Sequence, residues 1–114
     1  MKALDWIASS KKDLLEFPED VRKEVGYALY LAQNGDIHQN TKPLKGFWPG
    51  VYEIVSDYDK NTYRSVYIVN FHDKVYVLHC FQKKSKSGIS MPKEEINVIE
   101  RRLKFIKSMI GRKR

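Results

Sequence analysis

The stretch VYEIVSDYDKNTYRSVYIVNFHDKVYVLHCFQK, residues 51–83, decides the fold. It contains three runs rich in β-branched and aromatic residues, at 51–58, 62–71 and 74–83. Short polar breaks separate these runs, and such breaks are typical of β-hairpins. The stretch therefore predicts an antiparallel meander of three strands.

Two helices are predicted before the meander. Ser9-Ser10 is suited to cap a short first helix that continues to residue 15. Pro18 then opens a longer helix, because proline fits the first helical position. Asn34-Gly35 ends this helix, since glycine adopts the left-handed conformation at a helix C-terminus without strain. Residues 36–50 contain two prolines and two glycines and are predicted to be a long loop.

One helix is predicted after the meander, and it completes an α+β fold. Pro92 opens this helix, and an apolar stripe follows with helical spacing from Ile96 to Ile110. Residues 1–8 contain an apolar stretch that could add a short edge strand. We expect residues 1–114 to form one domain, in which helices cover one face of a three- to four-stranded antiparallel sheet.

The net positive charge of the chain lies almost entirely at one end. The net charge is +7; residues 83–114 contain eleven Lys/Arg and three Asp/Glu, which leaves residues 1–82 close to neutral. This distribution is typical of a polyanion binder, although a solvated basic tail would look the same. No apolar run reaches the ~18 residues of a membrane span, and the single cysteine, Cys80, excludes an internal disulfide. We therefore expect a cytoplasmic protein with no membrane association.

Four features of the chain occur together in a known family. A helical hairpin precedes the sheet; KPLKGFW (42–48) leads into VYEI; Tyr63-Arg64 begins the next strand; and VYVLHCFQKKSKSG (75–88) precedes a helix opened by proline. In this order they resemble the RelE/ParE superfamily of toxins, most closely its phage-derived HigB-like branch. The resemblance covers nearly the whole chain.

The resemblance implies a RelE-like fold, with helices on a twisted antiparallel sheet, and a specific activity. The protein would be the toxin of a type II toxin–antitoxin system, an endoribonuclease (mRNA interferase) that cuts messenger RNA on the ribosome and inhibits translation. Its partners would be the ribosome, the messenger RNA and a helix-turn-helix antitoxin, and no cofactor is implied.

The candidate catalytic residues are Arg64, Lys83 and Lys84. RNA cleavage of this type uses the ribose 2′-hydroxyl as the nucleophile, and nearby cations stabilise the charge that develops on the phosphate. Arg64 matches the family's strand arginine, whereas Lys84 stands where the family places an arginine and offers a point charge instead of a bidentate fork. The alternative for Arg64 is an exposed ion pair with Asp57 or Asp59.

Further candidates would contact RNA away from the cleaved bond. They are Lys42, Lys45, Lys86, Arg101 and Lys104. Simple surface exposure is an equal alternative for the first two, and a solvated loop is the alternative for Lys86. Phe47 and Trp48 could stack on bases, but core packing is the favoured interpretation. The basic face of the last helix could dock on ribosomal RNA or on an acidic antitoxin.

The general base is not apparent from the sequence. Glu53 and Val55 occupy the approximate positions of the family's strand lysines, and no tyrosine follows Tyr76. His79 titrates in a useful range, but its alternation with Val77 and Phe81 predicts a shared, buried face. Glu53 and a lysine of lowered pKa are further options.

The sequence disfavours other chemistries and leaves two other functions open. The three histidines have no metal-ligand spacing, so no metal is expected. A ParE-like inhibitor of DNA gyrase would bind a protein and need no converging cations. An inactive relative would only bind its antitoxin, and the missing tyrosine and lysines keep that alternative open.

Overall fold

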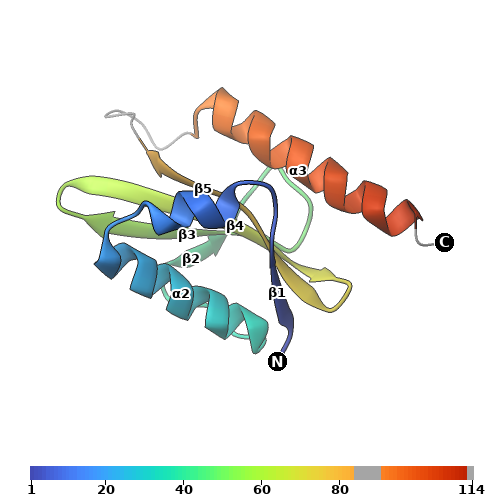
Figure 1. Ribbon diagram of the computed structural model, residues 1–114, viewed down its shortest axis with the longest axis horizontal. Coiled ribbons are helices and arrows are strands. Elements are labelled where there is room, and N and C mark those ends of the chain that lie inside the picture. Colours follow the sequence, from blue (N-terminus) through green and yellow to red (C-terminus); the bar gives the residue numbers. More distant parts are fainter. Residues whose placement is uncertain (84–90, 113–114) are drawn as a thin grey trace.

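The protein is described here by a computed structural model that covers residues 1–83 and 91–112, with side chains as far as Met109. It combines a five-stranded sheet with three helices in a mixed α+β fold (Figure 1). The elements are β1 (Ala3–Trp6), α1 (Ser10–Leu15), α2 (Glu19–Gln33), β2 (Thr41–Pro43), β3 (Val51–Tyr58), β4 (Asn61–Phe71), β5 (Lys74–Lys83) and α3 (Lys93–Arg112).

The strands of the sheet lie in the order β1-β5-β4-β3-β2. Strands β3, β4 and β5 form the predicted antiparallel meander, with bounds within one residue of the prediction. The expected number of strands was too low, because residues 41–43 of the predicted loop add an edge strand beside β3. The expectation of a wholly antiparallel sheet was also wrong, because β1 pairs with β5 in parallel.

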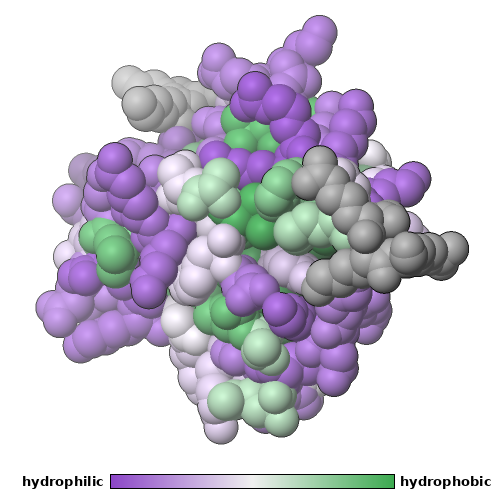
Figure 2. Space-filling view, turned by 45° about the vertical axis from the view of Figure 1, so that its right-hand side comes forward, coloured by the Kyte–Doolittle hydropathy of each residue, from purple (hydrophilic) through white to green (hydrophobic). Residues whose placement is uncertain are grey.

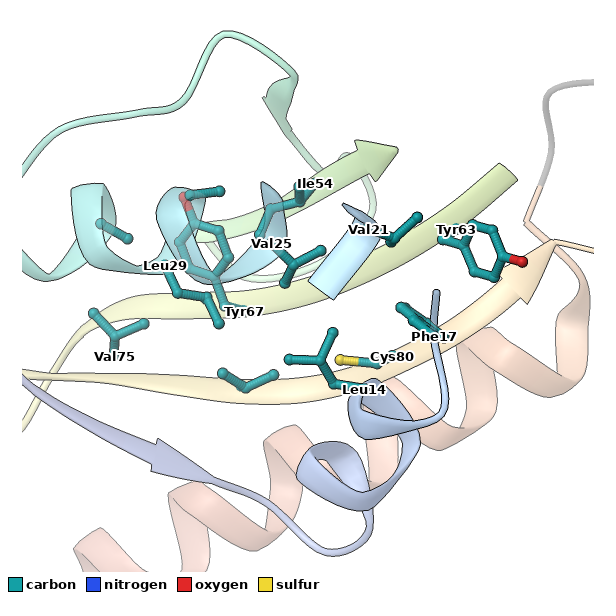
Figure 3. Close-up of a cluster of buried hydrophobic side chains, with 13 residues drawn as sticks. Leu14, Phe17, Val21, Val25, Leu29, Ile54, Tyr63, Tyr67, Val75 and Cys80 are labelled. Carbon is teal, nitrogen blue, oxygen red and sulfur yellow. The ribbon is translucent and has the colours of Figure 1, made fainter. Parts of the chain in front are cut away.

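Helices cover both faces of the sheet, not one as expected. Helices α1 and α2 lie on one side and α3 on the other (Figure 1). Side chains of β4 and β5 are therefore buried in nearly continuous runs rather than in alternation. On the α1–α2 side, Leu14, Val25 and Leu29 pack against Tyr67 and Cys80 (Figure 3).

The helix ends agree with the sequence signals except at α1. Gly35, with φ of 84°, follows α2, and the backbone N–H of Asp36 donates to the carbonyl of Leu31 at 2.8 Å, as in a Schellman motif. Ser10 does not cap α1, because its hydroxyl donates to the carbonyl of Val77 on β5. Helix α1 is thereby fastened to the sheet.

A β-bulge in β5 changes which face each side chain occupies. Val66 pairs with His79 and Tyr67 with Val77, so Leu78 is an extra residue on β5. Val77 faces α1 and α2, whereas His79 stacks on Phe81 on the α3 side, with ring centroids 4.8 Å apart. The prediction that His79 is buried is confirmed, but its predicted shared face with Val77 was wrong because of this bulge.

In the part of the chain that the structure describes, no helix is both long enough and apolar enough to cross a membrane.

Candidate nucleic-acid site

Charged side chains gather on the α3 side of the sheet, toward the turn between β3 and β4. Cross-strand pairing places them in three adjacent rows, because residues paired in a ladder share a face. The rows are Asp57–Thr62–Lys83, Val55–Arg64–Phe81 and Lys42–Glu53–Val66–His79. Val66 and Phe81 belong to the core beneath α3, which fixes this face as the α3 side.

Arg64 lies in a buried ion pair. Its Nη1 donates to Glu53 Oε2 at 3.0 Å, and the two side chains are 9% and 1% exposed. The alternative of an exposed pair with Asp57 or Asp59 is therefore wrong, and Asp57 instead accepts a hydrogen bond from Thr62. Glu53 is consequently not available as a free general base.

The hairpin turn explains why Glu53 is the partner. Asp59 and Lys60 both have positive φ, at 50° and 66°, which is typical of a two-residue type I′ turn that fixes the register. In that register Arg64 lies opposite Val55, with Glu53 and Asp57 as its two diagonal neighbours. Asp57 is exposed and Glu53 is buried, so the ion pair that excludes water is the one with Glu53.

Arg64 retains hydrogen-bonding capacity beyond this pair. A guanidinium has five N–H donors, and the Nε of Arg64 is buried with no partner in the structure. An unsatisfied buried donor costs free energy, so an anionic oxygen that reached it would gain a strong, charge-assisted bond. The arginine is thus fixed by Glu53 and has a donor that no described residue uses.

The other candidate cations are placed as follows. Lys83 is half-buried at the end of β5 and shares the face of Arg64, and Lys42 is exposed on edge strand β2 beside Glu53. The pairing therefore brings Lys42, Arg64 and Lys83 to one face of the sheet. Lys84 and Lys86 lie outside the described residues. The remaining three, Lys45, Arg101 and Lys104, are exposed on the loop after β2 and on α3.

A histidine–carboxylate pair borders this cluster. Nε2 of His79 lies 2.7 Å from Oε1 of Glu95 in the first turn of α3. Nδ1 of His79 is buried and has no hydrogen-bond partner among the described residues, so the neutral tautomer that donates from Nε2 leaves the lone pair of Nδ1 unused. Burial lowers the pKa of His79 below its ordinary 6.5 and outweighs the opposing effect of Glu95. Sequence reasoning missed Glu95, because no local pattern pairs a strand with a later helix.

Contacts of α3 hold this pair in place. Nη1 of Arg102 donates to the carbonyl of Leu78, the bulge residue, at 2.7 Å, and Nη2 donates to the hydroxyl of Ser9 at 3.2 Å. The bulge exposes a carbonyl that the ladder does not use, and the arginine fastens α3 to it. Glu95 is thereby kept over His79.

We expect acid to destabilise the protein through His79. Its pKa is lowered on folding, so the unfolded chain binds the proton more readily. The stability that neutral His79 provides is present above its ordinary pKa of 6.5 and is lost as pH falls through the folded-state value. Urea denaturation at pH 7.5 and 5.0 tests this against His79→Gln, which keeps an N–H donor but cannot titrate. The variant should lose less stability than the wild type, and equal losses would contradict the assignment.

Two other expectations concern cysteine and metal. Cys80 is 2% exposed in the α1–α2 core, and burial raises the pKa of its thiol to about 12, so it is a core residue and not a nucleophile. Among residues 1–83 and 91–112, no group of three or more His, Cys, Asp or Glu side chains could hold a metal ion.

The fold and the charged face define a small, basic α+β protein. Residues 12–104 match the family described as phage-derived protein Gp49-like, and the chain belongs to that family. It is thus a member of the RelE/Gp49 toxin-like proteins in the broad sense. The HigB-like branch stays a prediction. No curated protein matches the sequence.

Proposed function

We propose that the protein is the toxin of a type II toxin–antitoxin system and that it acts as a ribosome-dependent mRNA endoribonuclease. The observation that carries this proposal is the cluster of Lys42, Arg64, Lys83 and His79 on one face of the sheet in a Gp49-like chain. An inhibitor that only binds a protein needs no such set of cations on one face of the sheet.

The chemistry follows from the positions of these groups. A general base takes the proton of the ribose 2′-hydroxyl, and the oxygen attacks the adjacent phosphorus. Arg64 and Lys83 stabilise the extra negative charge on the phosphate oxygens. The bond from phosphorus to the 5′-oxygen breaks, and that oxygen takes a proton from Lys83 or from water. The products are a 2′,3′-cyclic phosphate and a 5′-hydroxyl end.

The partners of this activity follow from the same proposal. An antitoxin with a helix-turn-helix domain would neutralise the toxin in the cytoplasm. Arg101 and Lys104 are exposed on α3, so this helix offers a basic surface to ribosomal RNA or to an acidic antitoxin.

Inducible expression tests the proposal in cells. We expect growth to stop and messenger RNA to be cleaved, and a block of translation should prevent the cleavage. DNA damage with intact transcripts would instead indicate a gyrase inhibitor. Normal growth with intact transcripts would indicate an inactive relative, and either result would overturn the proposal.

A further inference from the structure

Two hollows flank Trp48, between α3 and the loop before β3. One has a volume of about 490 Å³ and is lined by Trp48, Pro49, Phe71 and Lys107. A smaller one, of about 110 Å³, is lined by Gly46, Phe47, Trp48, Glu100, Leu103 and Lys104. Figure 2 turns the right-hand side of Figure 1 forward, and hydrophobic residues gather there in the middle of a hydrophilic face.

The larger hollow combines flat aromatic faces with a cation. The rings of Trp48 and Phe71 are stacked, with centroids 5.7 Å apart and an interplanar angle of 25°. Nζ of Lys107 lies 5.7 Å from the centre of the Trp48 ring. Lys104 borders the other side of the same tryptophan. A half-buried aromatic pair thus lies between two lysines.

We propose that Trp48, Phe71, Lys104 and Lys107 form a subsite for single-stranded RNA, in which a nucleobase stacks on the aromatic pair and the lysines bind the flanking phosphates. Nucleotides combine a planar ring with an anionic group, and binding sites for single-stranded nucleic acid pair aromatic side chains with cations. An apolar helix of a partner protein would fit the hollow but would leave both lysines without an anion. Glu100 is the one acidic side chain among the residues that line these hollows.

The subsite lies on the α3 side of the sheet, as does Arg64, but at the other end of β4. Phe71 lies seven positions after Arg64, which is about 23 Å in a strand. The proposed subsite therefore holds RNA several nucleotides from the proposed cleavage point. This inference rests on the proposed function, because it takes RNA as the ligand.

Tryptophan fluorescence tests the subsite without any cleavage. Trp6 packs on the α1–α2 side, so a Trp6→Phe chain retains Trp48 as the reporter. The probe is a short 2′-O-methyl oligoadenylate, which lacks the nucleophilic hydroxyl, and inorganic polyphosphate is the charge-only comparison. We expect saturable quenching by the oligoadenylate alone.

Variants assign the binding to these side chains. Trp48→Leu removes the reporter, so its binding is measured by the polarisation of a dye-labelled oligoadenylate. This variant should bind about 5- to 150-fold more weakly, which corresponds to 1–3 kcal/mol for one stacked base. Lys107→Gln should reduce the slope of log affinity against log salt concentration by about 0.7. Lys11→Gln, on the opposite side of the sheet, is the matched control and should weaken binding less than Lys107→Gln does. If the Tm of Trp48→Leu shows that this variant does not fold, the comparison of Lys107→Gln with Lys11→Gln still decides the outcome.

Three results would overturn the subsite. They are binding without quenching, equal affinity in Trp48→Leu, or quenching by an acidic protein partner but not by RNA. If the protein cleaves messenger RNA but the oligoadenylate does not quench Trp48, the subsite alone is overturned. Quenching without cleavage supports the subsite and overturns the nuclease, so the two failures are distinguishable.

Discussion

Replacing Glu53 with leucine is expected to lower the free energy of unfolding by about 3–5 kcal/mol. The substitution leaves the guanidinium of Arg64, 9% exposed, without its carboxylate partner in the interior. Removing one member of a buried pair is costly because the other charge remains desolvated. The loss would be a large part of the stability of a small domain, and urea denaturation followed by circular dichroism measures it.

The double variant Glu53→Leu/Arg64→Met separates charge burial from general disruption. Well-packed apolar residues often replace a buried ion pair with little loss, so the double variant should recover most of the stability. Thr62→Ala, which removes the exposed hydrogen bond to Asp57, is the control and should cost far less. If the double variant loses as much stability as Glu53→Leu and Arg64→Met lose in sum, the buried ion pair is contradicted.

Arg64→Lys is expected to lower messenger cleavage about 100- to 1,000-fold, the usual effect of losing one donor to a developing oxyanion. Lysine keeps the charge and a contact to Glu53 but loses the planar fork. Arg64→Ala is a poor probe, because it would also leave Glu53 buried and unpaired. The rate of cleavage at matched ribosome concentration is the measurement.

A matched control keeps this result specific. Lys11→Met removes an exposed cation from α1, on the opposite side of the sheet, and should retain wild-type activity. The Tm of Arg64→Lys must stay close to that of the wild type for the comparison to hold. Full activity in a folded Arg64→Lys chain would remove the guanidinium from the reaction.

The meander and the longer helices could be predicted because their signals are local. The strand bounds of β3 and β5 follow from apolar runs and turn residues, and Gly35 ends α2 as its conformational freedom requires. Strand β1 depends on parallel pairing with a segment about 70 residues later, and β2 is three residues long and contains a proline. The apolar stretch at residues 1–8 predicted the edge strand β1 itself, but no local pattern predicts its parallel pairing or the strand β2.

The site was less predictable than the fold. The sequence indicates Arg64 and Lys83, and strand register then places them on one face. The register of a two-residue turn would have narrowed the partners of Arg64 to Glu53 and Asp57, but burial chooses between them, and burial depends on tertiary packing. The bulge at Leu78, which turns His79 toward Glu95, has no signature in the apolar pattern.

Cleavage in a reconstituted translation system tests the central claim most directly. Purified ribosomes translate a defined messenger RNA with the wild-type protein or with Arg64→Lys, and primer extension locates any new 5′ end. We predict cuts within the translated region that require ribosomes and that are nearly lost in the variant. An intact messenger in the presence of folded wild-type protein would contradict the account.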